Sequence, residues 1–297
     1  AKGSRYSYYL VGDMIVGTDK PHYLVATPGG DYLWRGDVPL KLDVSVTDSD
    51  MCEPLIAAIN DFHNYTKIRF VPYSNQNDFI TIRIGDPGQY RAGVSATGRR
   101  AGGQEIVIRK GGAKATFIHE MMHALGVIHE HQRPDRDKYI KFNPQNLIDP
   151  VLAGDYVIKQ GYTTYTPYDY SSVMHYDGAM AKPGTKIFEC KNNNVIVPCP
   201  VTMGGSKLSY NDMDGLNEMY KNVQFSGAGF TTPGYPIPPT GNDTGDIYIG
   251  WDYKDVQMRR SMNGGNRLIL VTAENAFRLK VKAPQTINHF NSCVWAY

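Results

Sequence analysis

The sequence predicts an α+β fold, in which a sheet is backed by helices and is followed by a half with little regular structure. Residues 49–62 carry apolar side chains at positions 51, 55, 58, 59 and 62, a helical spacing that predicts a helix packed on a sheet. Residues 68–73 and 79–84 are rich in β-branched and aromatic residues and predict two strands. Beyond Gly126 the chain becomes rich in Gly, Pro and Tyr, which favours irregular structure.

The remaining elements follow in order along the chain. A third strand is expected at 105–109, and a helix from about Lys114 to Leu125. The last helix of this part is expected near 211–221. Residues 226–245 are dense in Pro and Gly and predict a linker. The short apolar runs within 246–297 predict a small β-rich module, whose role the sequence leaves open between binding and simple packing.

Composition excludes several classes of partner. The chain has 297 residues and a net charge of +2, with acidic and basic residues interspersed, so no nucleic-acid footprint is expected. No run approaches 18 consecutive apolar residues, so we expect no membrane-spanning helix. We also expect a monomer.

Residues 119–129 contain the candidate metal-binding and catalytic residues. His119 and His123 are four residues apart and project from one face of a helix, with Glu120 beside them. If the helix continued, His129 would lie about 15 Å beyond His119 along its axis. A zinc–nitrogen bond is only about 2.1 Å long, so three-histidine ligation requires the chain to turn back. Gly126 tolerates the positive φ that such a turn needs.

This extended pattern, completed by a downstream Met-turn within residues 171–176, is typical of metzincin zinc endopeptidases. Two alternatives remain beside it. The histidines could lie on an ordinary solvated helix face, or the third ligand could be a distant Glu, as in gluzincins. His129 and the Met-turn favour the metzincin interpretation.

Two further motifs indicate which family of metzincins the sequence resembles. Residues 129–137 read His-Glu-His-Gln-Arg-Pro-Asp-Arg-Asp, and residues 171–176 read Ser-Ser-Val-Met-His-Tyr. Together with the zinc helix they resemble the astacin family of metzincins, and the similarity spans roughly residues 31–222. The resemblance implies a catalytic domain at 25–225, with a twisted mixed sheet, the zinc helix and an irregular second half. It also implies that 105–109 is an edge strand at the rim of the cleft, to which substrate adds in antiparallel extended form.

The resemblance assigns roles to the motif residues. His119, His123 and His129 would bind one Zn²⁺ ion as neutral imidazoles, with a water at the open position. Glu120 would take a proton from that water and pass it to the leaving amine. Tyr176 would ligate zinc at rest and steady the oxyanion in the transition state.

Two residues near the motif have supporting roles in the same family. Met174 would form an apolar floor beneath the metal without binding it. Glu130 resembles the residue that receives the mature N-terminus, although it could equally pair with Arg133 or Arg136. His131 and His175 are further imidazoles that the resemblance does not place on zinc.

The N-terminal segment resembles an inhibitory pro-segment. Residues 9–16 read Tyr-Leu-Val-Gly-Asp-Met-Ile-Val, similar to the family motif Phe-x-Gly-Asp with Leu10 in place of Phe. By this resemblance Asp13 would bind zinc in a zymogen, residues 1–24 would be the pro-segment, and activation would need a cut near Leu24–Thr27 by another protease or by self-cleavage. The alternative is an ordinary Gly-Asp turn between two apolar runs.

The four cysteines differ from the usual family pattern and favour a bacterial-type branch. Cys190 and Cys199 could close a short hairpin disulfide. Cys52 is either a buried thiol or a partner for Cys293. An oxidising compartment is therefore permitted, and we expect a secreted or exported protein.

The sequence leaves two candidate functions for this protein. The first is a zinc endopeptidase, held latent by Asp13, that cleaves extended protein substrates. The second is an adhesion or targeting protein that acts through 246–297 with little or no proteolysis. Lys182 and Lys186 lie beyond the Met-turn, where some family members read an acidic residue after the scissile bond, and they suggest an acidic preference.

Overall fold

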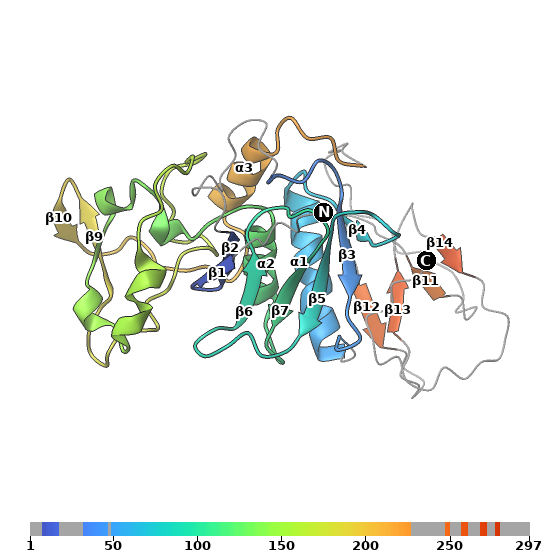
Figure 1. The fold of residues 1–297 in the computed structure, drawn as a ribbon, viewed down its shortest axis with the longest axis horizontal. Coiled ribbons are helices and arrows are strands. Elements are labelled where there is room, and N and C mark those ends of the chain that lie inside the picture. The colour runs from blue at the N-terminus through green and yellow to red at the C-terminus, as the bar shows by residue number, and fades with distance from the viewer. Residues whose placement is uncertain are drawn as a thin grey trace, which may run out of the picture.

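The computed structural model describes residues 8–17, 32–46 and 49–226, together with the backbone of four short strands between residues 247 and 279. Its largest sheet has seven strands in the order β1-β2-β6-β7-β5-β3-β4 (Figure 1). The sheet is mixed, since β1–β2 and β6–β7 pair antiparallel and the other neighbours pair parallel. The strands are β1 (Tyr8–Val11), β2 (Met14–Gly17), β3 (Val38–Leu42), β4 (Phe70–Pro72), β5 (Phe79–Ile84), β6 (Gly93–Ala96) and β7 (Gly103–Ile108).

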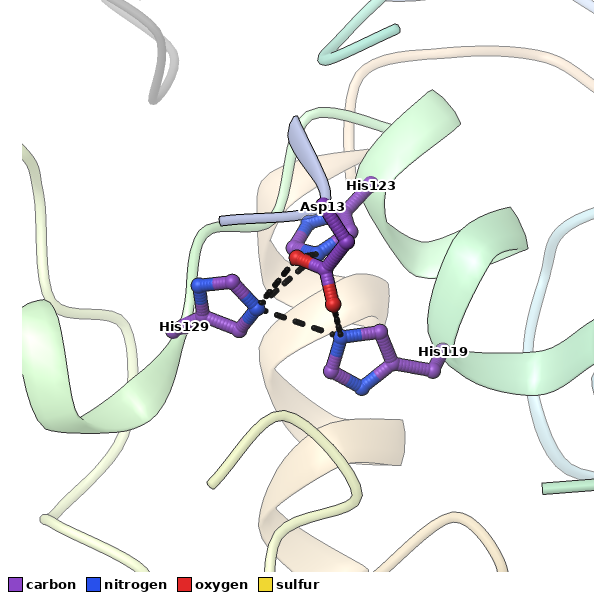
Figure 2. Close-up of side chains that lie close together, drawn as sticks. All are labelled: Asp13, His119, His123 and His129. Carbon is purple, nitrogen blue, oxygen red and sulfur yellow. Dashed lines mark hydrogen bonds and ion pairs between the residues drawn. The ribbon is translucent and has the colours of Figure 1, made fainter. Parts of the chain in front are cut away.

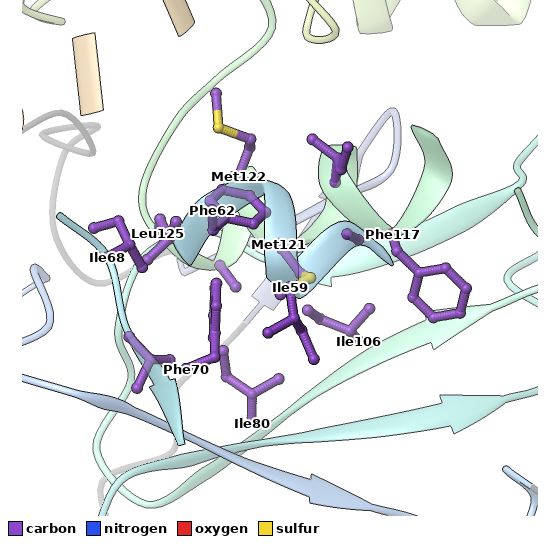
Figure 3. Close-up of a cluster of buried hydrophobic side chains, with 14 of the residues drawn as sticks. Ile59, Phe62, Ile68, Phe70, Ile80, Ile106, Phe117, Met121, Met122 and Leu125 are labelled. Atoms are coloured by element: carbon purple, nitrogen blue, oxygen red, sulfur yellow. The ribbon is translucent and has the colours of Figure 1, made fainter. Parts of the chain in front are cut away.

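Two long helices pack on this sheet, α1 (Ser49–Tyr65) and α2 (Lys114–Ala124). Their apolar stripes meet the sheet in one buried cluster, to which α1 contributes Ile59 and Phe62 and β5 contributes Ile80 (Figure 3). All three of these side chains are fully buried, which is the pattern expected of helices that cover a sheet face. The predicted helix at 49–62 is thus confirmed, and α2 matches the helix expected at about 114–125.

The predicted edge strand is wrong. Residues 103–108 form β7, which lies between β5 and β6 inside the sheet. The strand beyond it is β6, whose outer side is paired in parallel with β2 through Met14↔Ser95 and Ile15↔Ala96. The sequence Gly-Val-Ser-Ala of β6 is short and lacks the alternation of large apolar residues by which strands are recognised, so its place at the rim was missed.

The N-terminal segment forms a two-residue hairpin. Val11 pairs with Met14, which leaves Gly12 and Asp13 as the turn. Gly12 has a φ of +60°, as the first position of a type II′ turn requires. The hairpin forms the edge of the sheet next to β6, on the side of the second half of the molecule (Figure 1).

The second half has its own smaller core. It holds four 3₁₀ helices, η1 (Glu130–Gln132), η2 (Arg136–Lys138), η3 (Pro144–Asn146) and η4 (Pro150–Tyr156). A three-stranded antiparallel sheet joins β8 (Ile140–Phe142), β9 (Phe188–Asn192) and β10 (Val195–Val197). Helix α3 (Tyr210–Met219) closes this half near the position expected from the sequence.

The structure confirms the predicted Cys190–Cys199 disulfide and decides one of the two alternatives for Cys52. Cys190 and Cys199 form a disulfide, as expected for a short hairpin bridge. Cys52 is also disulfide-bonded, so the buried-thiol alternative is wrong, and its predicted partner Cys293 lies outside the described residues.

The C-terminal part is described only as paired strands. They are β11 (Ile247–Ile249) with β14 (Phe277–Leu279), and β12 (Gln257–Arg260) with β13 (Leu268–Val271), both pairs antiparallel. The predicted linker from residue 227 onward and the expected cut near Leu24–Thr27 lie outside the described residues. Within the part of the chain that the structure describes, no helix has both the length and the apolarity to cross a bilayer.

Candidate metal centre

Helix α2 and the turn after it bring three histidines together (Figure 2). His119 and His123 project from one face of α2, one turn apart. The helix ends at Ala124 with Leu125 as its C-cap, and Gly126 follows with a φ of +102°, its N–H donating to the carbonyl of His123. This left-handed residue turns the chain back, so that His129 approaches the two helical imidazoles.

The imidazole nitrogens have the spacing of a metal site. His129 Nε2 lies 3.2 Å from Nε2 of His119 and 3.2 Å from Nε2 of His123. In a tetrahedral zinc site with bonds of about 2.1 Å, ligand nitrogens lie about 3.4 Å apart. The histidine set therefore has close to the spacing that tetrahedral zinc requires.

The other ring nitrogens determine which tautomer faces the centre. His119 Nδ1 lies 2.8 Å from the carbonyl of Val173, and His123 Nδ1 lies 2.7 Å from the carbonyl of Val127. His129 Nδ1 lies 3.1 Å from Oε1 of Gln132. Because these oxygens can only accept, each Nδ1 carries the hydrogen and each Nε2 presents a lone pair to the centre.

Asp13 completes the cluster from the hairpin turn. Its Oδ1 lies 2.8 Å from His129 Nε2 and 3.3 Å from His123 Nε2, and its Oδ2 lies 3.3 Å from His119 Nε2. Burial raises the pKa of Asp13, but the positive charges of His129 and His119 in their protonated forms outweigh burial and hold the pKa well below its usual range. Three lone pairs and a carboxylate that face one another repel unless a cation lies between them, so the donor set fits a zinc ion with Asp13 as the fourth ligand.

Glu120 is buried beside the histidines. It is 1% exposed, and its Oε2 has no hydrogen-bond partner among the described residues. A Cβ on Gly93 of β6 would lie 2.5 Å from Glu120 Oε1, so a glycine there makes room for the carboxylate. Burial and then the charge of Asp13 raise the pKa of Glu120 well above its usual range. Its burial beside the histidines places this carboxyl group where it could accept and return a proton.

Tyr176 lies against both His129 and the hairpin turn at Gly12. Its ring centroid is 4.4 Å from that of His129, and a Cβ added to Gly12 would lie 2.8 Å from its hydroxyl oxygen. Burial, followed by the charges of Asp13 and Asp155, raises the pKa of Tyr176, so the hydroxyl keeps its proton and can donate it in a hydrogen bond. Met174, two residues earlier, is 1% exposed and packs in the same core as α2, as expected of an apolar floor.

Glu130 is half-buried in the second half of the molecule. Its Oε1 accepts from the backbone N–H of Asp169 and from Arg133 Nη1, both at 2.8 Å. The pairing with Arg133 that the sequence left open is therefore present, whereas Arg136 pairs with Asp137. Burial raises the pKa of Glu130 to about 8. Glu130 also lines a cavity of about 80 Å³ beside α3.

Other predicted residues lie apart from the centre. His131 and His175 are outside the four-residue cluster, and His175 Nε2 is bonded to the hydroxyl of Tyr168 at 2.7 Å. Lys182 is directed away, since its ammonium donates to the carbonyl of Gln145. Neither Lys182 nor Lys186 lines the cavity of about 130 Å³ beside Asp13, so the acidic preference has no support from this geometry.

Sequence reasoning missed two residues that connect the centre to its surroundings. Gln132 binds His129 with its amide oxygen and donates from its amide nitrogen to the carbonyl of Asp155 at 2.8 Å. Asp155 in turn accepts the N–H of Gly12. Gln132 stands at a variable position of the motif, and Asp155 lies in a segment that no motif covers, so no sequence signal marked either residue.

Comparison with known proteins is consistent with this geometry. A family model described as Astacin, a family of peptidases, matches residues 28–221. High choriolytic enzyme 1 of Oryzias latipes is 42% identical over 121 residues, which cover 40% of this chain and 43% of that protein. Zinc metalloproteinase nas-14 of Caenorhabditis elegans is 31% identical over 206 residues, covering 66% of this chain and 39% of that protein.

Among solved structures, the fold is similar to that of high choriolytic enzyme 1, described as a hatching enzyme zinc-protease from Oryzias latipes. The TM-score is 0.57 at 29% identity, and the match covers 66% of this chain and 96% of that one. The chain spans only about two-fifths of the length of these two relatives in the sequence comparison.

Proposed function

Because the chain belongs to the astacin family of peptidases, we propose that it is a zinc-dependent endopeptidase that hydrolyses extended protein substrates. The observation that carries the proposal is the convergence of three imidazole lone pairs beside a buried carboxyl group whose Oε2 has no hydrogen-bond partner among the described residues. His119, His123 and His129 supply the lone pairs, and Glu120 supplies the carboxyl group. Residues 25–225 are the catalytic domain in this proposal.

The metal, Glu120, Tyr176 and β6 contribute to the reaction in different ways. Zinc held by the three histidines would lower the pKa of a water toward about 7 and polarise the scissile carbonyl. Glu120 takes the proton of the attacking water and delivers it to the leaving amine. Tyr176 donates a hydrogen bond to the developing oxyanion, which its protonated hydroxyl permits. The substrate main chain pairs with β6, the strand at the rim.

The protein substrate reaches this site only when the hairpin leaves it. Asp13 occupies the position that the attacking water needs, and β2 covers the edge of β6. These contacts support a zymogen in which residues 1–24 are an inhibitory pro-segment and the activating cut falls near Leu24–Thr27. We expect Asp13→Ala to give activity without a cut, and full activity of the uncut wild type would contradict this part of the proposal.

The position of Glu130 supports a connection between the activating cleavage near Leu24–Thr27 and the metal centre. Glu130 is half-buried, and it lines the cavity beside α3, where a newly formed α-amino group would be a suitable ion partner. Its backbone N–H donates to the carbonyl of Met174 at 2.9 Å, so a change at Glu130 reaches the floor of the metal centre directly.

The proposed partners are protein substrates and an activating protease, or a second copy of the chain if cleavage is autocatalytic. The disulfide-bonded Cys52, Cys190 and Cys199 support secretion or export, since such bonds persist in oxidising compartments. Adhesion through 246–297 is favoured by none of the described residues.

The test is hydrolysis of denatured casein by the zinc-loaded, trypsin-cut chain and by its Glu120→Gln variant. We expect both proteins to bind one zinc per chain and the variant to lose activity by about 100-fold or more, because the proton acceptor is gone. A variant as active as the wild type would show that Glu120 is not the base and would favour the adhesion alternative.

A further inference from the structure

Two side chains outside the zinc motif hold the turn of the hairpin. Asp155 Oδ1 accepts the backbone N–H of Gly12 at 2.7 Å, and Arg91 Nε donates to the carbonyl of Gly12. Arg91 lies just before β6 in the sheet half, and Asp155 lies in η4 of the second half. Both line the cavity of about 130 Å³ beside Asp13 and Tyr176, and together they hold the backbone of one residue, Gly12, from both halves of the molecule.

Asp155 is positioned through the metal centre itself. Its carbonyl accepts from Gln132 Nε2 at 2.8 Å and from His131 Nε2 at 3.2 Å. Gln132 also accepts from Nδ1 of His129, the third histidine. A residue joined to a metal ligand by two successive hydrogen bonds is placed accurately with respect to the reacting bond.

In the hairpin, the space beside Asp155 is filled by the main chain of Gly12, whose backbone conformation leaves no room for a Cβ there. A Cβ at Gly12 would lie 2.8 Å from the Tyr176 hydroxyl, 3.5 Å from His129 Cε1 and 3.7 Å from Asp155 Cγ. Among the described residues, the N–H of Gly12 is the only hydrogen-bond partner of the Asp155 carboxylate. Once the hairpin leaves, this half-buried carboxylate faces the cavity with its acceptor capacity unused.

We propose that Asp155 is a substrate-binding residue, which accepts a main-chain N–H from the peptide residue next to the scissile bond, while Arg91 binds a main-chain carbonyl. The inference rests on the proposed endopeptidase function and names the groups that position its substrate. In the latent chain the hairpin uses the same two groups. Because an N–H is present on every residue except proline, Asp155 contributes affinity and leaves the sequence preference unchanged.

The test measures binding apart from catalysis. In the trypsin-cut, zinc-loaded Glu120→Gln background, the Kd of a fluorescein-labelled casein-derived peptide is measured by anisotropy, with and without Asp155→Ala. We expect Kd to rise about tenfold or more with Asp155→Ala and by a smaller factor with Asp155→Asn, which keeps an acceptor but loses the charge. With Glu120 intact, KM should rise by the same factors, and the residues flanking the cut bonds should not change.

Asp149→Ala is the structural control. The Asp149 side chain caps η4 by accepting the N–H of Val151, and η4 is the element that carries Asp155. We expect this variant to lower the Tm and to leave Kd unchanged.

Three outcomes separate the hypotheses. An unchanged Kd in Asp155→Ala, with an active wild type, overturns the role of Asp155 and leaves the endopeptidase intact. A cleavage profile that shifts with Asp155→Asn shows that Asp155 reads a side chain, which also overturns the proposal. A cut wild-type chain without activity removes the endopeptidase function and the substrate role together.

Discussion

The side-chain amide of Gln132 connects two parts of the site, since its oxygen accepts from His129 and its nitrogen donates to Asp155. Gln132 is fully buried, so water cannot replace either bond. It therefore fixes both the ring orientation of the third histidine and the position of the proposed substrate-binding carboxylate.

We predict that Gln132→Leu weakens zinc affinity by about 10- to 100-fold, because His129 loses the acceptor that orients it. The matched control is Gln132→Glu, which keeps the oxygen acceptor for His129 but adds a negative charge and places a second acceptor in front of the Asp155 carbonyl. It should bind zinc nearly as well as the wild type. Competition with a chromogenic chelator measures both. Equal zinc loss in the two variants would show that orientation of His129 is not the cause.

His63 is a buried neutral histidine outside the cluster of Asp13 and the three zinc-site histidines. His63 is 3% exposed, and its Nε2 accepts the backbone N–H of Phe70 at 2.9 Å. Burial, assisted by the positive charge of Arg69, lowers the pKa of His63 to about 3. Below its unfolded pKa of about 6.5, the unfolded chain binds a proton that the folded chain does not.

His63 thus contributes stability that is fully present above about pH 6.5 and is lost as the pH falls toward 3, by up to about 1.4 kcal/mol per pH unit. We predict that His63→Gln, which keeps an acceptor for Phe70, makes the free energy of unfolding less steeply dependent on pH in this range. Urea titrations from pH 4 to 8 measure the slope. Equal slopes in the two proteins would contradict the buried neutral state.

The spacing of the three histidines was predictable because helix geometry and one glycine determine it. Glu120 follows from the same motif. Gln132 and Asp155 were not predictable, because their roles depend on contacts between segments distant in sequence, and neither residue type is diagnostic at its position.

At the scale of elements, one carboxylate joins α3 to the Met-turn. Asp212 and Ser209 form a capping box at the start of α3. The same Asp212 carboxylate accepts from Ser172 Oγ at 2.6 Å and from the N–H of Val173 at 3.1 Å. The carbonyl of Val173 is the group that orients His119, so the helix cap also supports the metal centre.

We predict that Ser209→Ala costs about 1 kcal/mol of folding free energy, the usual loss of a helix cap. Asp212→Ala should cost about 3 kcal/mol or more, because it also leaves the buried Ser172 and Val173 donors unsatisfied. It should weaken zinc binding as well, while Ser209→Ala should not. Urea unfolding and zinc titration test this pair, and equal effects of the two variants would contradict the double role of Asp212.

The elements themselves were predictable where the apolar pattern is strong. Helices α1, α2 and α3 and strand β5 appear close to their predicted bounds. Strand β6 carried no such pattern, and the order of the sheet follows from pairings between strands that are not consecutive, so the rim was assigned to the wrong strand.

At the scale of the whole molecule, the site lies where two separate cores meet. One core joins the seven-stranded sheet to α1 and α2, and the other is built from the aromatic-rich second half. The change in composition after Gly126 predicted two unequal halves. The sequence could not show that the hairpin turn, held by Arg91 and Asp155, would lie between them, since that depends on tertiary contacts alone.

The most direct test of the account is casein hydrolysis by the zinc-loaded chain before and after limited trypsin treatment, with mass spectrometry locating the cut. We predict activity that appears only after cleavage near residues 20–30 and disappears with a zinc chelator, because Asp13 leaves the three histidines only when the hairpin is released. Full activity before any cut would contradict the latent state. Absence of activity in both states would contradict the zinc endopeptidase itself.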